Sequence, residues 1–337
     1  MTHNQPAVDF PSLLTGFLTI YLPVTRGCST NTVTSYRDTF ILLLRFLDRV
    51  EGIKSHQVSF LHLTTDRILK FVTWLQQERG NSLATANQRL AAIKSFMRYT
   101  QTKAPELITV SKPIIDMIVK KAPEPQLAYL SREGIQVLMA TAHEQGGLRD
   151  LALLACLYDG AARVQETADL NHADLHATKP VTITVTGKGN KTRIIPLTGR
   201  AGDIIARHAA SQHASTPNGP LFTSRRDTRL TRAGISAILA RHAANAHAAH
   251  PTLICSHVTP HMIRHSRAMH LLEDGVNLIY IRDLLGHTSI LTTETYAKAN
   301  PETKRAAIEK ASTIIIPEGT YDTQTRADLL NFLATLT

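Results

Sequence analysis

The chain has 337 residues, 43% of them hydrophobic, which is enough to bury two cores of ordinary size without disulfide staples. Its formal net charge of +10 favours a polyanionic partner, nucleic acid first. No apolar run approaches the roughly 20 residues of a membrane span, and no signal peptide is evident. Three scattered cysteines fit a reducing compartment. We therefore expect a cytoplasmic protein with no membrane partner.

Residues 1–104 form the first block of the chain. Apolar residues recur there at helical spacing, with breaks at 25–29, 51–59 and 79–82, which predicts four helices. The block holds 12 basic and 6 acidic residues. The polar faces of the predicted helices carry Arg37, Arg45, Lys70, Arg89, Lys94 and Arg98. A solvated basic face and a DNA-facing surface explain these residues equally well.

Four prolines stand among charged residues in 105–128, so we expect a linker there with at most one helix. Beyond it, apolar helices are predicted over 135–142 and 148–158. Alternating β-branched residues over 181–186 and 192–197 predict a β-hairpin with Lys188 at its tip. Helical spacing returns over 201–210, 232–247, 261–272, 278–285 and 301–311. The expected fold is mainly α with a small β-hairpin or sheet, a helical N-terminal domain preceding an α+β domain.

Two basic segments of the second domain are weak signals when each is taken alone. Residues 159–166 (DGAARVQE) place Arg163 just after a buried helix, with Glu166 three positions on; an ordinary surface salt bridge would have this spacing. In residues 187–193 (GKGNKTR), glycines permit a tight turn and leave Lys188 on a mobile tip, as in many charged hairpins.

Three further segments follow in a fixed order. Residues 260–265 (PHMIRH) put His261 and Arg264 at positions i and i+3, which share a helix face. Residues 284–287 (LLGH) end in His287, and residues 292–296 (TTETY) end in Tyr296. A lone histidine or tyrosine is more often a packed residue than a catalyst. The combination of all five segments favours a phosphoryl-transfer site.

With these residues the sequence resembles the tyrosine recombinase, or phage integrase, family, including its Xer-like and transposon members. The family shares an ordered set that matches Arg163, Lys188, His261, Arg264, His287 and Tyr296 here. The match covers about 131–311, and LLGH followed nine residues later by tyrosine is its most specific signature. Three departures surround the first arginine: Ala161 stands where the family usually has glycine, Ala162 where leucine is common, and Gln165 replaces a frequent serine.

The resemblance implies four parts of the chain. Residues 1–104 are a helical core-binding (SAM-like) DNA-binding domain, most recognisable at 31–37 (NTVTSYR), and 105–128 are the linker. Residues 129–311 are the integrase-type catalytic domain. The tail, 312–337, carries apolar residues that would dock on a neighbouring subunit or on their own domain.

The implied roles agree with elementary chemistry. Arg163 and Arg264 would clamp the charge of the phosphate under attack. Tyr296 would be the nucleophile, with His261 as the acceptor of its proton. Lys188 would protonate the leaving 5′ oxygen, and His287 would bond the phosphate or brace the site. Because these groups supply the positive charge, we expect no metal, no ATP and no other cofactor.

The predicted function is a site-specific DNA recombinase or integrase that cleaves and rejoins double-stranded DNA through a 3′-phosphotyrosine intermediate. A homotetramer on DNA is expected, with other recombinases or accessory proteins left open as partners. Three alternatives remain: a type IB topoisomerase acting as a monomer, a DNA-binding protein that has lost catalysis, and a metal-dependent nuclease. The six filled positions argue against lost catalysis, and the sequence offers no carboxylate cluster for a nuclease metal.

Overall fold

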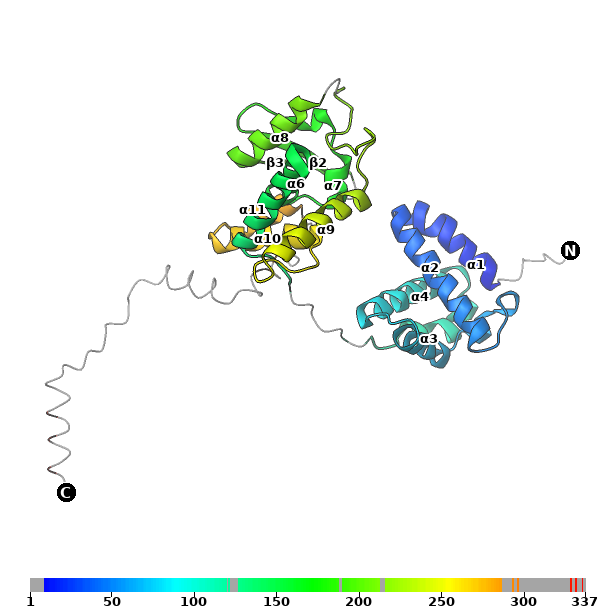
Figure 1. Cartoon of the computed structure of the whole chain (residues 1–337). Coiled ribbons are helices and arrows are strands. Elements are labelled where there is room, and N and C mark those ends of the chain that lie inside the picture. Colours follow the sequence, from blue (N-terminus) through cyan, green and yellow to red (C-terminus); the bar gives the residue numbers. More distant parts are fainter. Residues whose placement is uncertain are drawn as a thin grey trace. The chain divides into compact units, whose positions relative to one another are not determined.

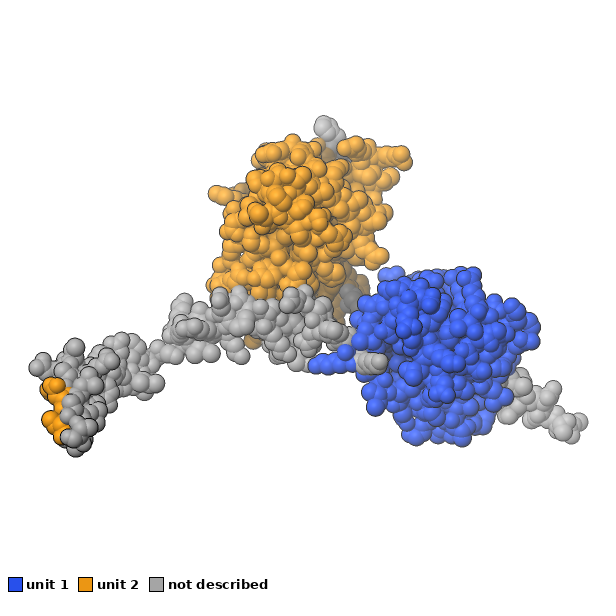
Figure 2. Space-filling model, turned by 60° about the horizontal axis from the view of Figure 1, so that its bottom comes forward, with its two compact units in different colours: residues 1–124 blue, residues 125–337 orange. Residues whose placement is uncertain are grey.

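The computed structural model describes residues 9–119, 121, 127–187, 190–212, 216–286, 293, 296, 328, 331 and 335. The chain divides into two compact units, residues 1–124 and 125–337. Figure 1 traces the elements along the chain, and Figure 2 colours the two units separately. Within the described residues, no helix is both long and apolar enough to cross a bilayer.

The first unit is helical. Its main helices are α1 (Phe10–Gly16), continued by a π-helical segment (Phe17–Thr25), α2 (Thr30–Arg49), α3 (Thr65–Gln77), α4 (Leu83–Lys103) and α5 (Ile108–Ile115). The ring of Phe96 packs edge-on against Phe17 and Phe40, with centroids 5.3 and 5.1 Å away. The four helices predicted before residue 101 are confirmed.

Helix α5 lies inside the segment predicted as a linker. Its Ile114 is fully buried and belongs to the core of the first unit, together with Phe71 and Ile93. Pro105 begins a short 3₁₀ turn, and Pro113 stands within α5. Because proline interrupts regular helical hydrogen bonding, the helical pattern is short there.

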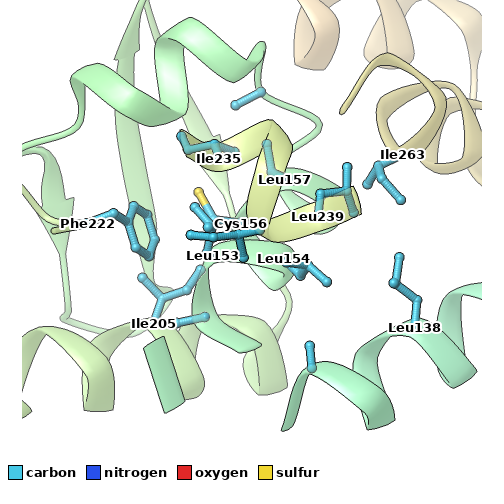
Figure 3. Close-up of a cluster of buried hydrophobic side chains, with 14 of the residues drawn as sticks. Leu138, Leu153, Leu154, Cys156, Leu157, Ile205, Phe222, Ile235, Leu239 and Ile263 are labelled. Atoms are coloured by element: carbon cyan, nitrogen blue, oxygen red, sulfur yellow. The ribbon is translucent and has the colours of Figure 1, made fainter. Parts of the chain in front are cut away.

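The second unit is built around α6 (Arg132–Asp159). The sequence predicts two helices here, and α6 is indeed interrupted by a kink at Gly147, whose φ of 70° lies outside the helical region. Figure 3 shows Leu153, Leu154 and Leu157 of α6 at the centre of the core. Within the described residues of this unit, the other α-helices are α7 (Val164–Asp169), α8 (Gly199–Ser211), α9 (Arg232–Ala249), α10 (Pro260–Glu273) and α11 (Leu278–Leu285).

A three-stranded antiparallel sheet accompanies these helices. Its order is β1 (Leu175–His176), β2 (Thr182–Thr186) and β3 (Thr192–Pro196). The β2–β3 hairpin is confirmed, with Thr186 opposite Thr192. β1 has two residues, too few to show an alternating pattern, so the sequence did not reveal it. The predicted helix over 301–311 lies outside the described residues.

Candidate active site

Arg163 stands at the N-terminus of α7, where its backbone and side chain share one partner. Its backbone N–H donates to Oε2 of Glu166 at 2.7 Å, and Nη1 donates to Oε1 at 2.8 Å. Nη2 donates to the carbonyl oxygen of Gly286, 3.2 Å away. The side chain of Arg163 is about a third exposed, so these hydrogen bonds fix it while part of it remains accessible to solvent.

Arg264 lies on α10, and its whole residue is only 3% exposed. Nη1 donates to the carbonyl oxygen of Ala161 at 2.6 Å, and Nη2 donates to that of Leu285. Burial, together with the nearby charge of Arg163, lowers the pKa of Arg264 to about 10, so it stays positive at neutral pH. Two carbonyl groups therefore fix a buried cation beside Arg163.

Ala161 explains one departure from the family pattern in physical terms. Its φ is 43°, in the left-handed region that glycine adopts without steric cost, and it is fully buried. The methyl group packs in a small apolar cluster with Ala268, Met269 and Tyr296. The backbone conformation that turns the Ala161 carbonyl towards Arg264 is thus kept with alanine.

Glu166 is the anion of this group, and its side chain is 4% exposed. It pairs with Arg163 and also with Arg193 of β3, whose Nη2 lies 2.8 Å from Oε2. Burial alone would raise the pKa of Glu166, but hydrogen bonds from Arg193 and Arg163 lower it to about 2. The carboxylate is therefore charged at every physiological pH.

Tyr296 is 1% exposed, and its hydroxyl oxygen lies 2.8 Å from Nδ1 of His265. Burial raises the pKa of Tyr296, against the opposing charge of Arg264. Burial, the neighbouring His261 and Arg264 together lower the pKa of His265 to about 4. His265 is therefore neutral at pH 7, and in the tautomer whose Nδ1 carries no proton it would accept a hydrogen bond from the tyrosine hydroxyl.

His261 stacks on His265, with ring centroids 5.9 Å apart, and is itself exposed. Partial burial of its ring against the protein, followed by the charges of Arg264 and Arg163, lowers the pKa of His261. The predicted pairing of His261 with Arg264 on one helix therefore brings a largely neutral imidazole beside two guanidinium groups.

Four of the six predicted site residues are described, and Arg163, His261, Arg264 and Tyr296 come together. Lys188 and His287 lie outside the described residues. Two residues were missed by the sequence reasoning. His265 stands four positions after His261 and so shares its helix face, a signal that the sequence contained. Arg193 lies on the same strand face as buried Ile195, opposite Val185.

Comparisons with known proteins agree on one family. Residues 128–303 match the model described as "Phage integrase family", and residues 15–103 match "Phage integrase, N-terminal SAM-like domain". Tyrosine recombinase XerC of Herpetosiphon aurantiacus is 33% identical over 288 residues, 82% of this chain and 87% of that protein. XerC of Pelobacter propionicus is 30% identical over 297 residues, 87% and 92% of the two chains.

Solved structures show the same fold. The Tn1549 transposon integrase in complex with a circular intermediate DNA is similar at a TM-score of 0.68 and 17% identity, covering 86% of this chain and 96% of that one. The XerH site-specific recombinase bound to a palindromic difH substrate gives a TM-score of 0.66 at 19% identity, covering 85% and 82%. The helical fold and the arginine–tyrosine site define the class, that of the tyrosine recombinases. The chain belongs to the phage integrase family.

Proposed function

We propose that this chain is a tyrosine-type site-specific DNA recombinase or integrase, which cleaves and rejoins double-stranded DNA through a 3′-phosphotyrosine bond. The observation that carries the proposal is the arrangement of Tyr296, its hydroxyl bonded to neutral His265 and its ring packed near buried Arg264. A tyrosine hydroxyl is a weak nucleophile at pH 7 and requires both nearby positive charge and a proton acceptor. Both stand beside it.

The two arginines serve as the phosphate clamp. A phosphodiester under attack gathers negative charge on its non-bridging oxygens, and fixed guanidinium groups stabilise that charge. Arg264 is fixed by two carbonyl groups and Arg163 by Glu166, so little reorganisation accompanies the reaction. With this charge supplied by the protein, we propose a reaction independent of metal ions and ATP, in which the phosphotyrosine retains the bond energy needed for rejoining.

Proton transfer needs one acceptor and one donor. His265 is the acceptor that the hydrogen bond supports, and His261, the acceptor predicted from the sequence, is the alternative one ring away. Lys188 remains the proposed donor to the leaving 5′ oxygen, and His287 the proposed phosphate ligand or brace. Tyr296 thus loses its proton as its oxygen bonds to phosphorus, while the departing oxygen gains one.

A covalent-trapping assay tests this function. The full chain is incubated with nicked duplexes bearing candidate sites from its own genomic flanks, with EDTA present, and a denaturant-resistant adduct is measured. We expect an adduct with the native protein and none with Tyr296→Phe, which keeps the ring and removes only the hydroxyl. An adduct that survives in Tyr296→Phe would overturn the assignment, and an adduct that requires Mg²⁺ would favour the nuclease alternative.

Double-stranded DNA is the proposed partner of both units, with 1–104 as the core-binding domain, 105–128 as linker and 129–311 as catalytic domain. Arg37 and Lys70 are exposed, whereas Arg89 bonds the backbone carbonyl of Ser35 and is partly used within the fold. If phosphate contacts supply most of the affinity, log Kd rises steeply and linearly with log salt concentration. A nearly salt-independent affinity would contradict this.

The cytoplasm is the proposed location, because the substrate is DNA.

We propose a homotetramer on DNA, in which copies of the chain contact one another through apolar surface. The second unit exposes Ile194 (67%) and Tyr280 (70%) beside a hollow of about 430 Å³ lined also by Leu271 and Val276. Such a surface suits the apolar tail, 312–337, of a neighbouring copy. The tail itself lies almost entirely outside the described residues.

Assembly is tested with two variants, truncation after Thr313 and Tyr280→Glu. Both should still bind one half-site, and both should form fewer complexes that join two sites in a gel-shift assay. Normal assembly by both would contradict the docking of the tail. A type IB topoisomerase would instead relax supercoiled plasmid as a monomer, without any requirement for paired sites.

A further inference from the structure

Arg193 is a charged residue on the face of β3 that otherwise points into the core. Its side chain is 15% exposed, and its neighbours on that face include buried Ile195 and, across the hairpin, Val185. Arginine is rarely buried unless all its donors are used. Here Nη1 and Nη2 donate to the two oxygens of Glu166 at 3.0 and 2.8 Å, and Nε donates to the carbonyl oxygen of Leu284 at 3.0 Å.

The Arg193–Glu166 pair also lies against two glycines at which an added side chain would crowd it. A Cβ on Gly286 would lie 2.8 Å from Nη1 of Arg193 and 2.9 Å from Cζ. A Cβ on Gly187 would lie 3.0 Å from Oε1 of Glu166 and 3.6 Å from Nη1 of Arg193. The backbone at both glycines therefore packs directly against the Arg193–Glu166 ion pair.

The two glycines directly precede two of the proposed catalytic residues. Gly187 immediately precedes Lys188, and Gly286 immediately precedes His287. The third partner of the pair is Arg163, bonded to Glu166 through both its backbone N–H and its side chain. The ion pair thus binds one proposed catalytic residue, Arg163, and contacts the glycines that directly precede two others, Lys188 and His287.

We propose that Arg193 is a positioning residue for the strand-cleavage reaction: through Glu166 it fixes Arg163, and through contact with Gly187 and Gly286 it sets the backbone from which Lys188 and His287 extend. The proposal rests on the proposed function. This role requires arginine in particular. The planar guanidinium group binds both carboxylate oxygens of Glu166 and still directs Nε to a carbonyl, whereas lysine presents one flexible point charge.

The test separates positioning of the proton donor from general loss of structure. In cleavage of an ordinary substrate, the oxygen of Tyr296 bonds to phosphorus, the bond from phosphorus to the 5′ oxygen breaks, and that oxygen takes up a proton. When sulfur replaces this bridging oxygen, the P–S bond breaks and a thiolate leaves without needing the proton, since thiols are far more acidic than alcohols. A variant impaired in proton delivery is therefore rescued by the sulfur substrate.

The full chain carrying Arg193→Lys is compared with native protein on matched oxygen and sulfur substrates, measuring the rate of covalent adduct formation. We expect the rate on oxygen to fall by about tenfold or more, and the ratio of sulfur rate to oxygen rate to rise by about tenfold or more. A melting curve verifies that the variant is folded. An equal loss on both substrates, or no loss at all, would overturn the proposal.

A second variant guards against misfolding of Arg193→Lys. Gly187→Ala keeps every charge and pushes a methyl group against Oε1 of Glu166, so it should show the same rise in the sulfur-to-oxygen ratio. Gly199→Ala, where an added Cβ meets nothing within 4 Å, is the matched control and should leave the ratio unchanged. An unchanged ratio in Gly187→Ala also counts against positioning. If native protein forms no adduct with either substrate, the proposed function fails instead.

Discussion

The hydroxyl oxygen of Tyr296 lies 2.8 Å from Nδ1 of His265, a histidine that stands directly after the buried Arg264 in sequence. If His265 takes the tyrosine proton, His265→Leu should slow adduct formation at pH 7 by about 100-fold, the usual range for loss of a general base. The slowed rate should then rise with pH as tyrosine ionises by itself. His261→Leu is the comparison: if it alone shows this pH dependence, the acceptor is His261.

Glu166 should make the second unit sensitive to acid. Its folded pKa is lowered from 4.5 to about 2, so its stabilisation is complete above about pH 4.5 and is lost as pH falls towards 2. That shift corresponds to on the order of 3 kcal/mol. Glu166→Gln should therefore be much less stable than native protein at pH 7, and the gap should narrow below pH 4.5.

The difference in stability between native protein and Glu166→Gln is measured by hydrogen exchange of α6 and α10 peptides. Tryptophan fluorescence would not report on this unit, because the chain's one tryptophan, Trp74, lies in the first unit. Trp74 fluorescence then serves as an internal control that should not respond to Glu166→Gln. A gap that stays constant from pH 7 to 2.5 would contradict the role of the charged carboxylate.

Gly286 and Gly275 make a matched pair for testing the close approach of Arg193. Both have positive φ, 62° and 78°, so alanine should strain either backbone by about 1 kcal/mol. Only at Gly286 would the new methyl group also meet Arg193, at 2.8 Å; at Gly275 nothing lies within 4 Å. Gly286→Ala should lower the melting temperature clearly more than Gly275→Ala, and equal shifts would show that Arg193 yields freely.

Asp150 of α6 links this helix to α9. Its fully buried carboxylate pairs with Arg149 at 2.7 Å, Arg241 at 2.7 Å and His242 at 2.8 Å. Asp150→Ala should cost about 1–3 kcal/mol of unfolding free energy, because it leaves the buried ring of His242 without its hydrogen-bond partner. The exposed pair of Asp203 with Lys179 is the control, and Asp203→Ala should change stability by less than about 1 kcal/mol.

The sequence predicted most helices and the hairpin, because their patterns of apolar residues are long and regular. It also predicted that Arg163, His261, Arg264 and Tyr296 would lie together in one site, because their motifs follow one another in the order typical of a known family. It also predicted two separate helices over 135–142 and 148–158, and Gly147, whose φ of 70° is not helical, interrupts the helical backbone between them.

Two site residues escaped for different physical reasons. Arg193 looked like one more charge in a basic hairpin, and only the strand register places it on the inward face. His265 was overlooked beside Arg264, yet its spacing of four from His261 already put both rings on one side of a helix. Long-range partners such as Leu284 and Glu166 depend on how distant segments pack, which local pattern does not encode.

The hydrogen bonds from Arg264 to two carbonyl oxygens affect the entropy of DNA binding. An arginine free in solvent gives up side-chain entropy of about 2 kcal/mol when a ligand immobilises it. Arg264 is already immobilised by Ala161 and Leu285 before any phosphate arrives. That loss is incurred once, during folding, and is not repeated at each encounter. Changes that loosen these two carbonyl groups would weaken phosphate binding without touching a single DNA contact.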